Sequence, residues 1–283
     1  MNVLFVCTGN TCRSIMAQGY LKSRNLSGVT VKSAGLCANG EKVSENACAA
    51  AKERNIDISR HISKQITQED INWADKIFCL GKSHYNALLS VGADAKKLFV
   101  LGDGIADPYG SGIEVYRMAL NEIITAIDSV FPKIETDKPT DSIIMQIAEL
   151  EKACFSEPWS AESVKSGIEN GSHIITATFG DKLAGYCIFD CVLDEGYICN
   201  IAVGEKYRRQ GVADLLMCEL DDFANGKNLS FVSLEVRQSN ASAINLYKKH
   251  KYIIEGERKN FYKNPSENAY IMTKRKKNEN FEY

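Results

Sequence analysis

The chain has 283 residues, which is more than one hydrophobic core usually supports and enough for two domains of common size. Its hydrophobic share of 45% and its charged share of 25% are those of an ordinary globular protein. The net charge of −2 excludes a strongly basic nucleic-acid-binding protein, and no apolar run approaches the length needed to span a bilayer. We therefore predict two domains, no direct nucleic-acid partner and no membrane span.

Cysteine and histidine usage bears on the compartment and on metal binding. Ten cysteines without regular spacing indicate reduced thiols and not a disulfide framework. The first six residues lack the basic start of a signal peptide, so we expect a cytoplasmic protein. No C-x-x-C pair occurs and the four histidines are scattered, so we expect no metal site.

Strand and helix signals alternate over the first 131 residues. Short apolar, β-branched runs predict strands at residues 2–6, 29–33, 76–80 and 97–101. Helical patterns occupy residues 14–22, 44–54, 83–90 and 113–131. This alternation predicts an α/β domain with a parallel sheet between helices, whose ligands bind at the carboxyl ends of the strands.

The order of elements changes after residue 132. The segment around Pro132 and Pro139 is polar and lacks apolar periodicity, so we predict a linker at residues 133–141. Beyond it, a mixed α+β pattern has helices at residues 142–155, 161–170, 211–225 and 241–250, and strands at 173–179, 182–192, 195–203, 230–237, 252–258 and 269–274. The predicted domains are residues 1–132 and 142–277, followed by a tail at 278–283.

A candidate phosphate-binding loop, residues 7–14 (CTGNTCRS), lies between the first predicted strand and the first predicted helix. Its C-x5-R spacing alone is weak evidence, because residues 48–54 repeat it inside helical sequence. Gly9 and Asn10 distinguish the first match, because they permit a tight loop whose N–H groups turn inward around an anion. The loop therefore predicts a phosphate site at the start of a helix.

Two side chains of this loop indicate covalent phosphate chemistry. Arg13 supplies a planar fork for two phosphate oxygens, and the same positive field favours the thiolate of Cys7. We predict that Cys7 is the nucleophile and that the substrate is bound by Thr8, Gly9, Asn10, Thr11, Cys12, Arg13 and Ser14, with Ser14 able to donate a hydrogen bond to the sulfur. A structural cysteine beside a turn is the alternative.

A nucleophilic attack on phosphorus needs a proton donor for the leaving group. Asp107 follows the last predicted strand of the first domain, in the segment DPYG, on the same sheet edge as the loop. We predict Asp107 as the general acid, although Asp-Pro also forms plain turns. Tyr109 is predicted to line the mouth of the site, or else to be a surface aromatic residue.

These residues resemble the low-molecular-weight protein-tyrosine-phosphatase family over residues 1–131, and so do the segments 33–35 (SAG) and 57–61 (DISRH). The resemblance implies a four-stranded parallel sheet flanked by helices. It also implies that Cys7 forms a phosphocysteine that water hydrolyses, that Arg13 binds the phosphate and that Asp107 is the acid, without a metal or another cofactor.

Position 11 bears on which phosphoprotein is the substrate. Tyrosine-directed members usually carry Ile or Leu there, whereas Thr11 resembles the bacterial protein-arginine phosphatases and favours phospho-arginine. Ile15 and Gln18 depart from the Pro and Glu common in that subfamily, so a tyrosine phosphatase stays the alternative. An arsenate reductase would need paired cysteines that the chain does not match. Cys12 is either a loop filler or the partner of Cys7 in a reversible disulfide.

A second anion-binding pattern occurs at residues 207–213 (YRRQGVA), after a predicted strand and at the start of a predicted helix. Small residues at positions 211 and 213 let a phosphate approach the backbone amides, and Arg208 and Arg209 add positive charge. Alone, this would be a basic capping turn. The segments 200–203 (NIAV) and 234–247 add a strand edge, and then a strand followed by a helix.

This set resembles the GCN5-related N-acetyltransferases over about residues 141–275. The resemblance implies acetyl-CoA binding by Ile201, Ala202, Val203, Arg208, Arg209, Gln210, Gly211, Val212, Ala213 and Asn240. More narrowly, residues 155–160 (FSEPWS) and 235–247 resemble the ribosomal-protein-alanine N-acetyltransferases, which implies Glu235 as base and Tyr247 as acid in transfer to a protein N-terminal amine. We therefore predict a bifunctional enzyme. The alternatives are a different amine acceptor, or one half that only binds.

Overall fold

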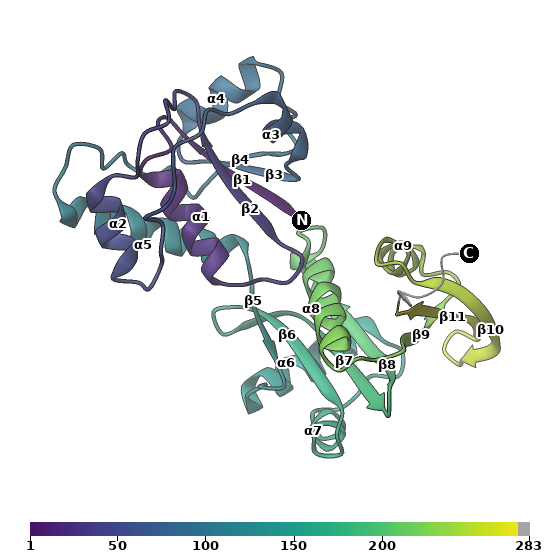
Figure 1. Ribbon diagram of the computed structural model, residues 1–283. Helices are drawn as coiled ribbons and strands as arrows, with labels where there is room; N and C mark the ends of the chain where they lie inside the picture. Colours follow the sequence, from purple (N-terminus) through teal and green to yellow (C-terminus); the bar gives the residue numbers. More distant parts are fainter. Residues whose placement is uncertain (277–283) are drawn as a thin grey trace. The chain divides into compact units, whose positions relative to one another are not determined.

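The computed structural model describes residues 1–276 of the chain (Figure 1). The chain divides into two compact units, unit 1 from Met1 to Phe131 and unit 2 from Pro132 onward. Each unit has its own sheet and its own buried cores. The predicted tail at residues 278–283, with the last predicted residue of the second domain, lies outside the described residues.

The sheet of unit 1 is parallel throughout, in the order β2-β1-β3-β4. Its strands are β1 (Asn2–Cys7), β2 (Thr30–Gly35), β3 (Lys76–Cys79) and β4 (Leu98–Val100). β1 lies inside the sheet and is buried from Val3 to Cys7, as expected of a parallel strand that is covered on both faces. The predicted parallel sheet is confirmed.

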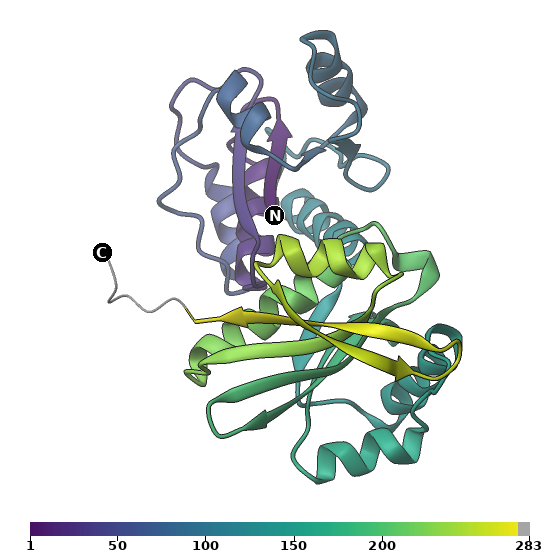
Figure 2. The same ribbon diagram turned by 90° about the vertical axis from the view of Figure 1, so that its right-hand side faces the viewer.

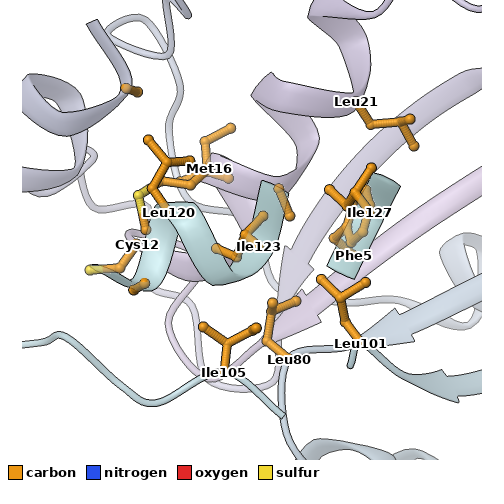
Figure 3. Close-up of a cluster of buried hydrophobic side chains, with 14 of the residues drawn as sticks. Phe5, Cys12, Met16, Leu21, Leu80, Leu101, Ile105, Leu120, Ile123 and Ile127 are labelled. Carbon is orange, nitrogen blue, oxygen red and sulfur yellow. The ribbon is translucent and has the colours of Figure 1, made fainter. Parts of the chain in front are cut away.

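Helices cover both faces of this sheet. They are α1 (Arg13–Ser23), α2 (Glu45–Lys52), α3 (Gln68–Trp73), α4 (Lys82–Ser90) and α5 (Ile113–Val130). Because successive strand residues point to opposite faces, Phe5 and Cys7 join a core with α1, α2 and α5, whereas Leu4 joins one with α3 and α4. Figure 3 shows the first core, with Phe5 of β1 and Ile127 of α5 among its members.

Unit 2 has a seven-stranded sheet in the order β10-β11-β9-β8-β7-β6-β5, antiparallel except between β8 and β9. Figure 2 shows this sheet from a second direction, with the β10–β11 hairpin in yellow. The strands are β5 (Lys133–Thr136), β6 (His173–Phe179), β7 (Lys182–Val192), β8 (Glu195–Val203), β9 (Phe231–Arg237), β10 (Ile253–Tyr262) and β11 (Glu267–Arg275).

Two pairs of helices cover the two faces of the second sheet. Helices α6 (Asp141–Cys154) and α7 (Ala161–Glu169) pack on one face through a core that contains Ile147 and Val164. Helices α8 (Val212–Gly226) and α9 (Ala241–Lys249) pack on the other face through a core that contains Leu216 and Tyr247. The predicted mixed α+β domain is confirmed.

Strands β8 and β9 separate partway along their length. They pair only where Glu195–Ile198 faces Phe231–Leu234. Beyond that point, residues 200–203 of β8 pair with β7 alone, and residues 235–237 of β9 pair with β11 alone. The sheet of unit 2 therefore opens between two strands that carry predicted site residues.

The predicted linker is wrong, because four of its nine positions form strand β5. Lys133–Thr136 pairs antiparallel with β6, and Ile134 packs against the core of unit 2. Asp137, which follows β5, accepts a hydrogen bond from the backbone N–H of Ile174 at 2.9 Å. A four-residue edge strand with one packed apolar side chain is too short to give a period-two signal, which explains the error.

Candidate active sites

The first candidate site is the loop between β1 and α1, at the carboxyl edge of the parallel sheet. Its residues are the predicted 7–14, most of them buried. The end of β2 fits closely against it, since a Cβ on Gly35 would lie 2.6 Å from the carbonyl oxygen of Thr8. Glycine at position 35 therefore lets the neighbouring strand support the loop.

The Cys7 thiol lies among hydrogen-bond donors from its own loop. The residue is 3% exposed, and its Sγ lies 2.9 Å from Ser14 Oγ. The backbone N–H of Asn10 donates to the same sulfur at 3.3 Å. Two donors directed at one sulfur stabilise a thiolate, so the geometry suits a nucleophilic cysteine.

Asn10 holds the loop in shape. It has a φ of 57°, in the left-handed region, whereas Gly9 is not among the residues with positive φ. Its Nδ2 donates to Ser14 Oγ at 2.9 Å and to Ser33 Oγ at 2.8 Å. Its Oδ1 lies 2.9 Å from His61 Nε2 and accepts from the Lys64 N–H at 3.0 Å. The loop's tight turn thus depends on Asn10 and not on Gly9.

Arg13 and Asp107 form an ion pair at the mouth of the loop. The guanidinium is buried and also donates to the carbonyl oxygen of Ile105 at 3.1 Å, while 49% of the Asp107 side chain is exposed. The predicted phosphate-binding group and the predicted acid are therefore in contact. Tyr109 is 75% exposed next to them, where it can meet an incoming substrate.

Two further loop residues are held by side chains that sequence reasoning did not single out. Thr8 Oγ1 lies 3.0 Å from Nε2 of His84, an almost fully buried histidine whose pKa is lowered by burial and by the charge of Arg13. Cys12 Sγ lies 3.4 Å from the hydroxyl of Tyr116, and burial raises the pKa of that tyrosine to about 12. Thr11 is buried, with Oγ1 3.6 Å from Cys12 Sγ.

The sequence signals for these supporting residues differ in strength. Ser33 and His61 lie in segments that carried the family resemblance, but their bonds to Asn10 could not be read from spacing. His84 and Tyr116 had no motif around them at all. Helix α3 was missed although Thr67 and Asp70 form a capping box, which is a recognisable start signal.

The second candidate site lies where β8 leads into α8. Gly211 is the N-cap of α8 with a φ of 94°, and Arg209 also has a positive φ of 63°. The first helical hydrogen bond of α8 runs from Leu215 N–H to Gly211, so the preceding amides point out of the helix end. Nothing would lie within 4 Å of a Cβ on Gly211, and this open, amide-lined end fits a pyrophosphate group.

The other predicted cofactor residues lie on β8, on the loop before α8 and at the start of α9. Ile201, Ala202 and Val203 lie on the part of β8 that has left β9. Arg208 donates from Nε to the carbonyl oxygen of Val203 at 3.0 Å, so its fork is partly used within the loop. The chain brings together at this end Arg208, Arg209, Gln210, Gly211, Val212 and Ala213. Asn240 caps α9 by accepting from the Ala243 N–H at 3.1 Å.

Glu235 and Tyr247 come from opposite faces of the opened sheet. Along β9, Leu234 and Val236 are buried in the core that contains Tyr247, while Glu235 alternates with them. Glu235 Oε1 accepts from Arg258 Nη1 at 2.7 Å, and its side chain is 33% exposed. Burial raises the pKa of Tyr247, which keeps its phenol protonated. The pair can therefore hold a carboxylate and a proton donor on either side of the opening.

A buried carboxylate near this opening was missed. Glu151 of α6 is fully buried and accepts hydrogen bonds from the Tyr186 hydroxyl, from Asn200 Nδ2 of β8 and from the backbone N–H of Trp159 at 3.0 Å. It thus ties α6 and the start of α7 to the separated part of β8. An acidic residue in a helical pattern gave no signal for this role.

Residues 1–276 offer neither a metal site nor a membrane-spanning helix. Within that range, no cluster of three or more His, Cys, Asp or Glu side chains is arranged to hold a metal ion. None of the helices described there is long and apolar enough to cross a membrane.

The chain matches two family models, one for each unit. The model for low molecular weight phosphotyrosine protein phosphatase matches residues 2–140, and that for the acetyltransferase (GNAT) family matches residues 144–252. A protein-arginine-phosphatase from Geobacillus stearothermophilus is 43% identical over 145 residues, covering 48% of this chain and 97% of that protein.

The relatives that match unit 2 are acetyltransferases. The [ribosomal protein bS18]-alanine N-acetyltransferase of Escherichia coli (strain K12) is 34% identical over 125 residues, covering 44% of this chain and 84% of that protein. Among solved structures, an arginine phosphatase from Geobacillus stearothermophilus is similar at 42% identity and a TM-score of 0.43, covering 45% of this chain and 88% of that chain. The chain is therefore a fusion of two enzymes, a member of the low molecular weight phosphotyrosine protein phosphatase family followed by a member of the GNAT acetyltransferase family.

Proposed function

We propose that unit 1 dephosphorylates phospho-arginine in proteins through a phosphocysteine intermediate. The observation that carries the mechanism is the Cys7 sulfur with two hydrogen-bond donors, Ser14 Oγ and the Asn10 N–H, directed at it. The name of the protein-arginine-phosphatase relative, at 43% identity, supports the substrate. Thr11 supports it too, because a polar floor suits a guanidinium phosphate better than a phenyl ring does.

The reaction begins when the substrate phosphate reaches Arg13. The phosphate takes the place of the Asp107 carboxyl group at the guanidinium, which frees Asp107 to carry the proton for the leaving group. Cys7 Sγ then bonds to phosphorus while the bond to the leaving nitrogen breaks, and Asp107 donates its proton to that nitrogen. In the second step of the reaction, the water oxygen attacks phosphorus and displaces the Cys7 sulfur, while Asp107 takes a proton from that water. This step releases inorganic phosphate and the thiolate.

The test compares phospho-arginine and phosphotyrosine proteins side by side, with three residues at position 11. Thr11→Val replaces the hydroxyl by a methyl group and keeps the shape of the side chain. Thr11→Ile also removes the hydroxyl and is one methylene group longer than Val. If the hydroxyl selects the substrate, both variants lose preference for phospho-arginine, and Ile gains the most on phosphotyrosine. A wild-type preference for phosphotyrosine would overturn the proposed substrate, and equal preference ratios in all three proteins would remove Thr11 as the selector.

We propose that unit 2 transfers an acetyl group from acetyl-CoA to the N-terminal amine of a protein, with a ribosomal protein alanine as the favoured acceptor. The supporting observation is the opening between β8 and β9, with the N-terminus of α8 beside it. The name of the Escherichia coli relative supports the acceptor. The alternative, another primary amine, keeps the same site.

Bound acetyl-CoA would supply the acetyl group as an activated thioester. The α8 amides near Gly211, with Arg208 and Arg209, would hold its pyrophosphate. Glu235 would take a proton from the acceptor ammonium, directly or through water, once that cation displaces Arg258 from the carboxylate. The freed amine would be the nucleophile for the acetyl group, Tyr247 would donate its proton to the departing sulfur, and the second proton lost by the nitrogen would return to the Tyr247 oxygen.

Acetyl-CoA binding can be measured without knowing the acceptor. Trp73 lies in unit 1 and Trp159 in unit 2, so in a Trp73→Phe background the fluorescence of Trp159 reports on unit 2. Saturating acetyl-CoA should raise this unit's melting temperature by linkage. Gly211→Asn and Gly211→Asp share the strain of a positive φ and differ in charge. The Asn variant should keep the stabilisation and the Asp variant should lose it; no shift in the parent protein would contradict acetyl-CoA binding.

The cysteines bear on the cellular compartment in which the protein acts. All ten cysteines are unpaired in the structure, and a thiolate nucleophile needs a reducing environment to stay active. We propose that the protein acts in the cytoplasm, where a ribosomal acceptor is also present. Persistent oxidation of Cys7 in protein isolated from cells under non-reducing conditions would contradict this.

A further inference from the structure

Arg237 ends strand β9 at the wide end of the opening and contacts two separate segments. Its Nη1 donates to the carbonyl oxygen of Pro265 at 3.0 Å, and its Nη2 to that of Asn264 at 2.9 Å. The same Nη2 donates to Ser156 Oγ at 3.2 Å. The guanidinium carbon lies 4.2 Å from the centre of the Tyr262 ring. With 21% of its side chain exposed, Arg237 is a fixed and largely desolvated group.

The position of Arg237 puts it on the acceptor's side of the sheet. Glu235 and Arg237 are two residues apart on β9, so their side chains share one face. Leu234 and Val236 point to the other face, into the core with α8 and α9. An amine that reaches Glu235 from the face of α6 and α7 therefore passes Arg237.

The two segments that Arg237 contacts border the opening from opposite sides. Residues 155–160 connect α6 to α7, and Glu151 fixes them to β8 by bonding both Trp159 N–H and Asn200. The turn at residues 263–266 joins β10 to β11, which pairs with β9. One segment thus moves with β8 and the other with β9, and Arg237 ties them together.

We propose that Arg237 is a positioning residue for the acceptor, fixing the spacing of the two segments between which the first residues of a protein N-terminus reach Glu235. This inference rests on the proposed acetyl transfer. Arg237 touches no reacting atom in that reaction. Its loss therefore weakens acceptor binding and leaves the acetyl-CoA site, on the opposite face, intact.

An arginine on the β10–β11 hairpin, Arg275, provides a control for Arg237 of β9. Arg275 of β11 makes two hydrogen bonds of 2.9 Å to Glu255 of β10 and lies over the Phe231 ring at 5.4 Å. Arg237 likewise has a carboxylate contact, from Nη1 to Glu267 Oε2 at 3.2 Å, and an aromatic contact with Tyr262. Arg275 lacks the bond to residues 155–160. Arg275→Gln therefore perturbs the hairpin and its contact with Phe231, but no bond to residues 155–160.

The experiment measures steady-state acetylation of a peptide with a free N-terminal alanine, using the full-length chain. Arg237→Gln should raise the KM for the peptide about tenfold, because its charge-assisted bonds to both segments are lost, while kcat stays within about threefold. Arg275→Gln should change neither. Ser156→Ala removes one bond only, so it should raise KM less and add nothing in the Arg237→Gln background.

Hydrogen exchange gives a readout that does not need turnover. Residues 155–160 should exchange faster in Arg237→Gln and at the wild-type rate in Arg275→Gln, with acetyl-CoA stabilisation equal in all three proteins. A peptide KM unchanged in Arg237→Gln, or equal losses in both arginine variants, would overturn the inference alone. A wild-type protein that binds acetyl-CoA but acetylates no N-terminal peptide would overturn the proposed acceptor and the inference with it.

Discussion

In unit 1, eight consecutive residues at the junction of β1 and α1 hold the proposed nucleophile, the proposed anion-binding turn and the guanidinium. In unit 2, the corresponding groups come from β8, β9, α8 and α9, and they meet only because two strands separate. Six of the eight loop residues in unit 1 are buried, whereas the arginines of the unit 2 loop are exposed. A site made from one run of sequence is held by local bonds, while a dispersed site depends on the packing of whole elements.

This difference predicts how each site responds to damage. In unit 1, one atom or one bond can be removed without disturbing the sheet. In unit 2, substitutions near the opening should also change the spacing of the two segments that Arg237 contacts, residues 155–160 and 263–266. Substitutions in the loop of unit 1 should therefore have large chemical effects and small structural ones.

The largest effect is expected from Cys7→Ser. A serine hydroxyl is a far weaker nucleophile than a cysteine sulfur, so phosphate release should fall to the background rate. The melting temperature and the acetyl-CoA response of unit 2 should not change. The measurement is phosphate release from phosphorylated protein over hours.

Cys48→Ser is the matched control for Cys7→Ser, since Cys48 lies in the same unit and has the same C-x5-R spacing but sits on α2, outside the loop. It should keep most of the activity. Turnover that persists in Cys7→Ser, or that disappears equally in both variants, would contradict the assignment of Cys7.

A smaller chemical effect is expected from Asp107→Asn. An amide cannot protonate the leaving nitrogen, so the rate on phospho-arginine proteins should fall by about 10²–10⁴. The loss should be much smaller for 4-nitrophenyl phosphate, whose leaving group needs little protonation. A uniform loss on both substrates would mean that Asp107 acts by holding Arg13 and not as the acid.

The sequence predicted the local site of unit 1 more fully than the dispersed site of unit 2. Every strand of the first sheet and the whole loop were predicted, because alternation and the 7–14 motif are local signals. The bonds that fix Asn10 come from Ser33, His61 and Lys64, which are distant in sequence and become neighbours only in the folded sheet. In unit 2, the role of Glu151 escaped prediction for the same reason, since its partners Tyr186 and Asn200 lie on distant strands. Strand β5 was missed because it is too short to give a period-two signal.

The packing of unit 2 also contains a titrating group whose effect on stability can be measured. His250, largely buried at the end of α9, lies 3.1 Å from Asp214 and 3.6 Å from Asp221, both on α8. Burial lowers the pKa of His250, but the bonds to the two carboxylates outweigh it and the net pKa is raised. Asp214 has its pKa lowered to about 2, chiefly by its bond to His250.

The sign of the pH dependence follows from the raised pKa. Protonated His250 stabilises the folded state fully below its unfolded pKa of about 6.5, and this stabilisation is lost as pH rises through the folded pKa. In a Trp73→Phe background, the unfolding midpoint reported by Trp159 should therefore fall from about pH 6 to about pH 8.5 more steeply than in His250→Gln. Parallel pH profiles would contradict the role of the ion pairs.

The smallest effect is expected from separating the units. The two chemistries share no intermediate, since one removes phosphoryl groups and the other acylates an amine. Fragments 1–131 and 132–283 should therefore each keep the kcat/KM of the intact chain within about threefold, as independently folding domains do.

A cut after Thr136 is the informative contrast. It would strip β5 from β6 and separate Ile134 from the core of unit 2, which should destabilise the second fragment by about 1–3 kcal/mol. Chemical denaturation of the two C-terminal fragments measures this difference. If the cut at residue 131 destroyed either activity, or if acetyl-CoA changed the phosphatase rate in the intact chain but not in the mixed fragments, the units would be coupled and the dispersed site of unit 2 would depend on more than its own sheet.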